Sequence, residues 1–251
     1  MKDEIESVLN QFDKIDLEGL EKVKLLNRVD SKFIFHATEL LDVLNAIKID
    51  YSILEIDDLH SFNYETIYYD SHKFQLYHAH HNGKLNRFKI RRRHYLYNNQ
   101  NFFEVKQKIK GNRTYKFRIE KSGDGNFFSD VEQEMLNLSG APKIELEEKL
   151  KVYYTRLTFA SKSENERITI DLGLTYSNEN VRRELKELII LEVKQDKMKR
   201  NSGVVHYFKS KNIRPLSISK YAIGIAMLEK CVKKNAFKSK ILQINKLLTN
   251  A

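Results

Sequence analysis

The chain has 251 residues, of which 44 are basic and 34 acidic, and its formal net charge is +10. Hydrophobic residues make up 41% of it, enough for a folded core, and the single cysteine, Cys231, excludes an internal disulfide framework. Because no run of apolar residues approaches the roughly 18 that a membrane span needs, we expect a cytoplasmic protein. The positive net charge favours anionic partners.

The first fifty residues are predicted to form short helices around one strand. Apolar residues recur at helical spacing over 3–12 and 17–26, whereas residues 28–35 are typical of a strand. Thr38 is a candidate N-cap for a further helix over 39–47.

The middle of the chain is predicted to consist mostly of strands joined by hairpins. Turn signals stand at Asn82-Gly83, at 98–101 and at Gly111-Asn112. The strands between them cover residues 64–69, 87–96, 102–109 and 114–120, and residues 74–80 are either a short helix or a strand.

The remainder of the chain brings helices back between further strands. Helices are predicted over 131–138, 145–152, 204–211, 219–232 and 239–248, and strands over 153–161, 167–175 and 188–195. With two prolines, no linker-like stretch and no internal repeat, residues 1–251 are expected to form one domain. Hairpin-joined strands with helices clustered at the ends predict an α+β fold with an antiparallel sheet.

Several of the predicted strands have one charged and one apolar face. Successive side chains of a strand point to opposite sides, so residues two apart share a face. The charged faces carry Arg87, Lys89, Arg91 and Arg93; Glu104, Lys106 and Lys108; Arg167 and Asp171; and Glu192 and Lys194. Like charges at this spacing repel, so we expect a bound anion or facing carboxylates to neutralise them, and we expect the acids to be too few to do so alone. A barrel with a charged lumen and an apolar outer face covered by helices accounts for both faces.

An ordered set of short motifs lies in these segments. In chain order they are Arg28-Val-Asp-Ser-Lys32, Thr66-Ile-Tyr-Tyr-Asp70, Lys89-Ile-Arg91-Arg-Arg93-His-Tyr95, Phe103-Glu104-Val-Lys106-Gln-Lys108, Tyr153-Tyr-Thr-Arg156, Thr169-Ile-Asp171, Leu191-Glu192-Val-Lys194 and Leu216-Ser-Ile-Ser219-Lys220-Tyr221. Together they resemble the VTC-type polyphosphate polymerase domain, which belongs to the triphosphate tunnel metalloenzymes, also called the CYTH superfamily.

The resemblance covers a core over about residues 25–230, with flanking helices at both ends. It implies an antiparallel β tunnel barrel with a charged lumen, helices packed outside, and transfer of the γ-phosphate of ATP onto a growing polyphosphate chain with Mn²⁺ or Mg²⁺. The implied catalytic residues are Lys32, Arg91, Arg93, Lys106, Arg156 and Lys194, with Arg28, Lys89, Lys108, Ser219 and Lys220 binding the substrate and Glu192 the metal. The partners implied are ATP and inorganic triphosphate or polyphosphate, and association with a separate membrane subunit is left open.

The chain departs from the family patterns at two places. Hydrolytic members of the superfamily open with Glu-x-Glu-x-Lys, whereas this chain has Arg28-x-Asp30-x-Lys32, which disfavours hydrolysis by a metal-activated water. Ser217 stands where the polymerase pattern tends to carry a base, and Arg214 is the candidate to compensate for it.

Other functions are compatible with the same residues. A hydrolase of triphosphate or polyphosphate with this fold is one alternative, and a module that binds polyphosphate or inositol pyrophosphate without turnover is another. A cationic strand face can also simply be solvated. Of the aromatic residues near the basic strands, only Tyr95 and Tyr97 share the charged face, so no specific nucleic-acid partner is expected.

Some charged residues have two interpretations. Asp171 and Glu104 are either further metal ligands or partners of arginines, and pairing is favoured for Asp171. The histidines between residues 72 and 81 are expected to be exposed rather than zinc ligands, because no cysteine accompanies them. Arg182-Arg183 is expected on a solvated loop or helix face.

Overall fold

The computed structural model describes residues 2–22, 29–110, 113–120, 128–196 and 202–249. Arg28, one of the expected substrate-binding residues, lies outside these ranges, and so do the turn predicted at Gly111-Asn112 and the start of the strand predicted over 28–35.

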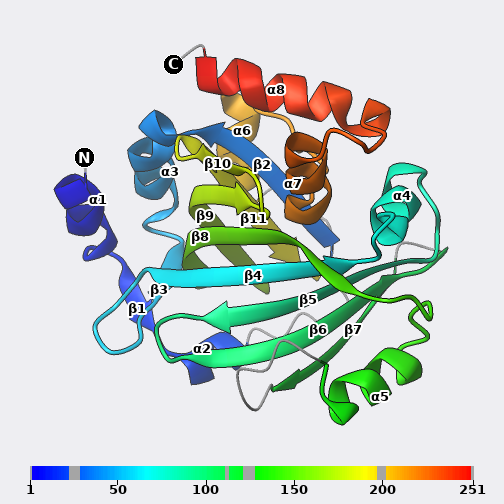
Figure 1. Ribbon diagram of the computed structural model, residues 1–251. Coiled ribbons are helices and arrows are strands. Elements are labelled where there is room, and N and C mark those ends of the chain that lie inside the picture. The colour runs from blue at the N-terminus through cyan, green and yellow to red at the C-terminus, as the bar shows by residue number, and fades with distance from the viewer. Residues whose placement is uncertain (1, 23–28, 111–112, 121–127, 197–201, 250–251) are drawn as a thin grey trace.

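A strongly curved 11-stranded sheet forms the frame of the molecule (Figure 1). The hydrogen-bonded order is β2 (Val29–His36), β11 (Leu188–Gln195), β9 (Glu166–Ser177), β8 (Glu147–Ser161), β4 (Phe62–Asp70), β5 (Arg87–Tyr95), β6 (Gln100–Lys108) and β7 (Thr114–Glu120). Three short strands extend the sheet: β10 (Arg182–Leu185) pairs with β9, β3 (Tyr51–Leu54) with β8, and β1 (Asp13–Ile15) with β3. The pairing is antiparallel except between β1 and β3, so the predicted antiparallel α+β architecture is confirmed.

Helices lie mostly at the two ends of the chain and on the outside of the sheet (Figure 1). They are α1 (Lys2–Leu9), α2 (Leu17–Lys22), η1 (Ala37–Glu39), α3 (Leu40–Ile47), α4 (Gln75–His81), α5 (Asp130–Leu138), α6 (Gly203–Ser210), α7 (Lys220–Leu228), η3 (Asn235–Phe237) and α8 (Lys238–Thr249). Within the described ranges, none of them has the length and apolarity required to cross a membrane.

The apolar face of the sheet packs outward against helices. Phe33 of β2 stacks on Phe208 of α6 with ring centroids 4.5 Å apart, and α3 completes this cluster. On the other half of the sheet, Ile90 and Phe103 are fully buried with Met135 of α5. The expected alternation therefore holds, because the apolar residues of the basic strands face helices and the charged residues face the concave side.

Alongside α8, whose Ile244 is buried with Ile34 of β2 and Ile190 of β11, the helix α7 packs on the concave side of the sheet instead. Its Tyr221 is buried among residues of β4, β8 and β9. Gly224 permits this close approach, since a Cβ atom there would lie 2.6 Å from a side-chain atom of Leu150 and 2.8 Å from one of Tyr176. We call the concave side of the sheet, together with the start of α7, the inner face.

The edge strands β2 and β7 are not paired with each other in the part of the chain that the structure describes. The expected barrel is therefore a curved sheet without a closed ring of hydrogen bonds. Irregular register at Tyr68/Tyr69 and between Tyr153 and Thr155 occurs in the long strands, where β-bulges increase bending and twist. The backbone N–H of Leu216 donates to the carbonyl oxygen of Lys32 at 2.7 Å and covers part of the free edge of β2.

The helix predicted over 145–152 is wrong, because most of this segment forms the first half of β8. Its residues pair with β4, from Glu147 opposite Asp70 to Val152 opposite Thr66. Leu150 and Val152 are buried on the inner face against α7, so tertiary packing overrides the local helical preference.

The Asn82-Gly83 signal ends a helix and does not form a hairpin. Residues 74–80 become helical because the buried Asp70 carboxylate accepts hydrogen bonds from the N–H groups of Leu76 (2.8 Å) and Tyr77 (2.9 Å). Gly83 then adopts a φ of 68°, which favours glycine after a helix.

Two smaller expectations are also wrong. Thr38 lies inside η1, and His36 is the residue that caps it. Arg182 and Arg183 belong to the strand β10 rather than to a loop or helix, because they pair with Ser177 and Tyr176 of β9.

Candidate functional site

The expected site residues that the structure describes all come from elements that border the inner face. They are Lys32 on β2; Lys89, Arg91 and Arg93 on β5; Lys106 and Lys108 on β6; Arg156 on β8; Glu192 and Lys194 on β11; and Ser219 and Lys220 at the start of α7.

Strands that are far apart in the sheet meet across this face. Four strands separate β5 from β2, yet the charges of Lys32 and Glu192 both act on the pKa of Lys89. The ammonium group of Lys89 also donates to Ser219 Oγ, at 3.0 Å, which ties β5 to the start of α7. The curvature of the sheet therefore gathers the predicted cations into one region.

Glu192 lies between two lysines. Lys32 Nζ is 2.5 Å from Glu192 Oε1, and Lys194 Nζ is 3.3 Å from Oε2. Thr169 Oγ1 accepts a further hydrogen bond from Lys194 at 3.2 Å. Burial alone would raise the pKa of Glu192, but the charges of Lys194 and Lys32 outweigh it and hold the pKa well below its usual range. Glu192 is therefore ionised at neutral pH.

Asp171 pairs with one arginine and one lysine. Arg156 binds it in a bidentate manner, with Nε 2.6 Å from Oδ1 and Nη2 2.9 Å from Oδ2, and Lys220 donates to the same carboxylate. Burial opposes ionisation, but the charges of Arg156 and Lys220 lower the pKa of Asp171. The pairing favoured for Asp171 is thus confirmed.

Glu104 is fully buried and pairs with Arg91, whose Nε lies 2.6 Å from Oε2. Lys116 and Arg118 of β7 also approach the carboxylate, at 2.6 and 3.9 Å. Against its burial, the charges of Arg91, Arg93 and Lys116 lower the pKa of Glu104. Lys116 and Arg118 were not predicted as site residues, although their alternation in β7 is the same signal as in the other basic strands.

Tyrosine rings support several of the cations, a feature that the sequence analysis also missed. The guanidinium carbon of Arg93 lies 5.9 Å from the ring centre of Tyr64, and that of Arg156 lies 5.2 Å from the ring of Tyr154. Lys220 Nζ lies 4.8 Å from the Tyr154 ring. Tyr95, a candidate for base stacking, packs against Tyr64 at 4.8 Å between ring centroids.

The expectation that carboxylates are too few to neutralise the cations is wrong for part of the set. The three ion-pair clusters hold Lys32, Lys194, Arg156, Lys220 and Arg91. The expectation is right for another part of the set. Within the described ranges, no ion pair with a carboxylate is formed by Arg87, Lys89, Lys106 or Lys108. Burial, then the charges of Lys32 and Arg91, lower the pKa of Lys89 to about 7, and the charge of Arg91, then burial, lower that of Lys106 well below its usual range.

The donor set suits a divalent cation only if the substrate contributes ligands. Among the described residues, no group of three or more His, Cys, Asp or Glu side chains is placed to hold a metal ion. Glu192 offers one ionised carboxylate that is 17% exposed on the inner face. A hard cation bound by one or two carboxylates and by phosphate oxygens fits such a position.

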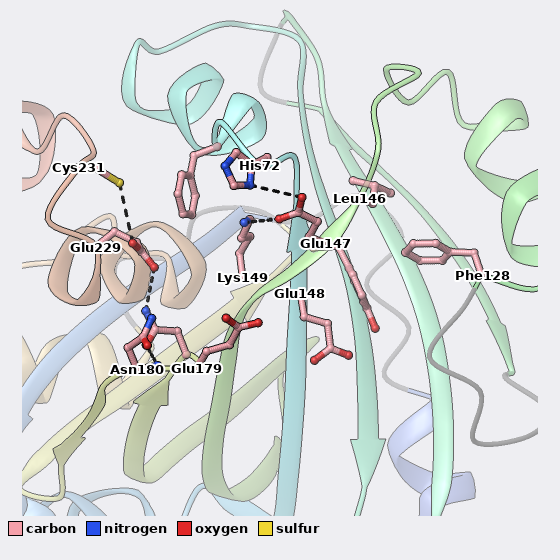
Figure 2. Close-up of a pocket in the computed structure, with 13 residues that line it drawn as sticks. His72, Phe128, Leu146, Glu147, Glu148, Lys149, Glu179, Asn180, Glu229 and Cys231 are labelled. Atoms are coloured by element: carbon pink, nitrogen blue, oxygen red, sulfur yellow. Dashed lines mark hydrogen bonds and ion pairs between the residues drawn. The ribbon is translucent and has the colours of Figure 1, made fainter.

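The pocket in Figure 2 has the wrong charge for phosphate. It has a volume of about 720 Å³ and lies where β8 begins, next to the end of α7. Its lining includes four carboxylates, Glu147, Glu148, Glu179 and Glu229. Lys149 and His72 both interact with Glu147, so little positive charge is left to face a ligand.

Of the four clustered histidines, only His72 is exposed as expected. His78 and His81 are half-buried against the ring of Tyr77, at 5.4 and 6.2 Å between ring centroids. His80 packs edge-on against Phe237, 5.6 Å away. The aromatic packing of α4 against η3 covers His80 and His81, whereas His78 contacts the ring of Tyr77 within α4.

Comparisons with known proteins identify a family and similar folds. The family described as VTC domain matches residues 27–229. The structure of a candidate adenylate cyclase from Bacillus halodurans is similar at a TM-score of 0.51 and 12% identity, with 77% of this chain and 94% of that chain covered.

Two further solved structures are similar. PH1819 protein from Pyrococcus horikoshii OT3 has a TM-score of 0.43, 15% identity and coverage of 80% and 99% of the two chains. A candidate adenylyl cyclase from Hippeastrum, described as having a dominant triphosphatase activity, has a TM-score of 0.46, 13% identity and coverage of 80% and 96%. No curated protein matches the chain.

Proposed function

The chain belongs to the VTC domain family, and from this premise we propose that it is a polyphosphate polymerase that transfers the γ-phosphate of ATP to a growing inorganic polyphosphate chain. The observation that carries the proposal is the convergence of cations from β2, β5, β6, β8, β11 and α7 on one face of the sheet. A chain of phosphates is the ligand whose charge density matches such a face.

The inner face supplies donors that a phosphate can use at once. The Nε atom of Arg93 is buried and has no hydrogen-bond partner among the residues that the structure describes, and a phosphate oxygen would satisfy it. Lys89 and Lys106 lack carboxylate partners in the described ranges, so an incoming anion would stabilise their charged forms. Ser219 caps the N-terminus of α7, which adds a partial positive charge.

Phosphoryl transfer depends on positioning and charge neutralisation more than on a protein nucleophile. We assign Lys32, Arg91, Arg93, Lys106, Arg156 and Lys194 to the reacting phosphates, and Arg28, Lys89, Lys108, Ser219 and Lys220 to the rest of the substrate. A terminal oxygen of the existing chain attacks the γ-phosphorus, the bond from that phosphorus to the β-phosphate oxygen breaks, and ADP leaves. Glu192 would hold Mn²⁺ or Mg²⁺, which supplies additional charge neutralisation to the phosphate oxygens when bound.

The affinity for triphosphate is expected to fall as the pH rises above about 7, because Lys89 of the free protein loses its proton there. Binding an anion above this pKa requires proton uptake, so the logarithm of the affinity falls by up to about one unit per pH unit. Calorimetric titrations with tripolyphosphate across the neutral range measure the slope.

The ligand also titrates in this range, but its titration contributes equally to the profile of every variant. Two substitutions therefore isolate the contribution of Lys89. Lys89→Arg keeps the positive charge and should flatten the profile relative to the wild type, and Lys89→Met should flatten it at lower affinity. If both variants retain the wild-type slope, Lys89 is not the group that titrates.

A binding module without turnover is the second candidate, and one observation favours it. Glu192 is already held by Lys32 and Lys194, and a metal ion would have to displace or share these partners. In that case polyphosphate would bind to the cations of the inner face without being formed or cleaved.

One experiment separates these functions. The purified protein is incubated with ATP and Mn²⁺, and the products are resolved on a gel for polyphosphate. Long anionic product with release of ADP supports the polymerase. ADP and free phosphate without a long product identify a hydrolase, and intact ATP together with measurable polyphosphate binding identifies a binding module.

A further inference from the structure

A row of cations leads from the inner face towards the C-terminal helix. Lys89 is directly opposite Lys106 in the β5–β6 pair, and Arg87 is directly opposite Lys108 two residues further along. Residues two apart share a face, so Arg87 and Lys108 continue the charged surface of Lys89 to the beginning of β5. Arg87 Nη1 donates to the carbonyl oxygen of Lys84 at 2.9 Å, which fixes it beside the end of α4.

The C-terminal helix contributes a further cation at this point. The Phe237 ring lies between α4 and α8: His80 is 5.6 Å from it and Lys240 Nζ is 5.9 Å from its centre. The backbone N–H of Ala236 also donates to His81 Nε2 at 3.3 Å. Figure 1 shows the beginning of α8 on the same side of the molecule as α4. These contacts hold Lys240 and His80 around the same ring, and the helix α4 that carries His80 packs against β5.

The row contains no compensating acid in the part of the chain that the structure describes. Arg87, Lys89, Lys108 and Lys240 form no ion pair there. The positive charge of the row acts on His80. Burial, and then the charges of Lys89, Arg87, Lys240 and Lys108, lower the pKa of this side chain to about 3. Four cations around a neutral imidazole repel one another unless an anion lies among them.

We propose that this row is a second binding segment, which holds a phosphate chain that continues beyond the triphosphate length and passes from Lys89 over Arg87 and Lys108 to Lys240. The proposal rests on the proposed function of the inner face and extends its binding site to the C-terminal helix. Lys240 is the new element, since it lies outside the residues 27–229 that the family matches.

The chemistry of the row selects a long linear anion over a compact one. A triphosphate at Arg91 and Arg93 leaves α8 without a contact, whereas a longer chain gains contacts with lysines as point charges and with a guanidinium fork. Each cation added along the chain also releases counterions, so the affinity for the long ligand should depend more steeply on salt.

The test compares tripolyphosphate with a length-fractionated long polyphosphate, using calorimetry on the full chain. Lys240→Gln is expected to weaken binding of the long chain by roughly two- to fivefold, as for one partly exposed ion pair, and to leave tripolyphosphate unaffected. Lys240→Arg should restore the affinity. Lys246→Gln is the matched control, because it removes the same charge from an exposed position on the same helix.

Equal losses in Lys240→Gln and Lys246→Gln would overturn the proposal, because they would reflect net charge alone. It would also be overturned if the long chain binds no more tightly than tripolyphosphate to the wild type. The thermal unfolding midpoint of each variant is measured first. If only Lys240→Gln shifts this midpoint, the affinity of Lys240→Arg for the long chain decides whether the lost charge explains the weaker binding. If tripolyphosphate itself does not bind, it is the proposed function of the inner face that fails.

Discussion

Glu192→Gln is expected to abolish metal-dependent turnover while tightening the binding of triphosphate in the absence of metal. The carboxylate is the proposed metal ligand, and replacing it by a neutral amide should lower turnover by a factor of order 10²–10³. The same change leaves Lys32 and Lys194 without their negative partner, and their charges become available to phosphate. Turnover of ATP with Mn²⁺ and calorimetric binding of tripolyphosphate without metal measure the two effects.

The opposite directions of the two effects make this substitution informative. A residue that acts only as a charge partner would raise the affinity and leave turnover intact, and that result would remove Glu192 from the metal site. Glu187→Gln is the matched control, because this exposed glutamate lies on the turn between β10 and β11, away from the inner face. It should change neither quantity.

The faces of the strands could be predicted from the sequence, because side-chain direction alternates with a period of two. Arg91 points to the inner face and Ile90 to α5, in agreement with their parity. The helices at the ends were also recognisable from their apolar spacing. The first half of β8 was not, since Leu150 and Val152 are fixed by contacts with α7, which is distant in sequence.

The partners of the cations depend on strand register, which the pattern of residues does not fix. The three main ion pairs, Lys32 with Glu192, Arg91 with Glu104, and Arg156 with Asp171, are all directly opposite each other on neighbouring strands. A turn at residues 98–101 would shift the β5–β6 pair and would place Arg91 opposite Lys108. The observed turn is centred two residues earlier and places Glu104 there. The charged face was therefore predictable, whereas its internal neutralisation was not.

These ion pairs preorganise the cations of the inner face. In the free protein, carboxylates hold the cations in fixed positions, which lowers the cost of ordering them when phosphate binds. Arg91 and Arg156 are both held in this way, whereas the Nε atom of Arg93 has no hydrogen-bond partner in the described part of the chain. A phosphate would thus bind partly in competition with the protein's own carboxylates and partly at donors that are still unsatisfied.

Glu104→Gln is expected to destabilise the free protein by about 3–5 kcal/mol, because it leaves the buried Arg91 guanidinium without its carboxylate. Tripolyphosphate should recover much of this loss, since a phosphate oxygen can take the place of the carboxylate. The pKa of Glu104 is lowered in the folded protein, so the pair stabilises it above the ordinary pKa of a glutamate and the effect is lost as the pH falls through the lowered value. Urea unfolding at neutral pH, with and without tripolyphosphate, measures both quantities.

The neighbouring residue on the same strand supplies the matched control. Arg92 points outward and pairs with Glu132 of α5 at 3.1 Å, between the rings of Tyr69 and Phe128. Glu132→Gln removes a buried carboxylate from an arginine in the same way and should cost a similar amount of stability, but the ligand cannot reach this side of the sheet. The stabilisation by tripolyphosphate should therefore exceed the wild-type value in Glu104→Gln and equal it in Glu132→Gln. Equal stabilisation of the two variants would mean that phosphate does not contact Arg91, and that this ion pair serves the fold alone.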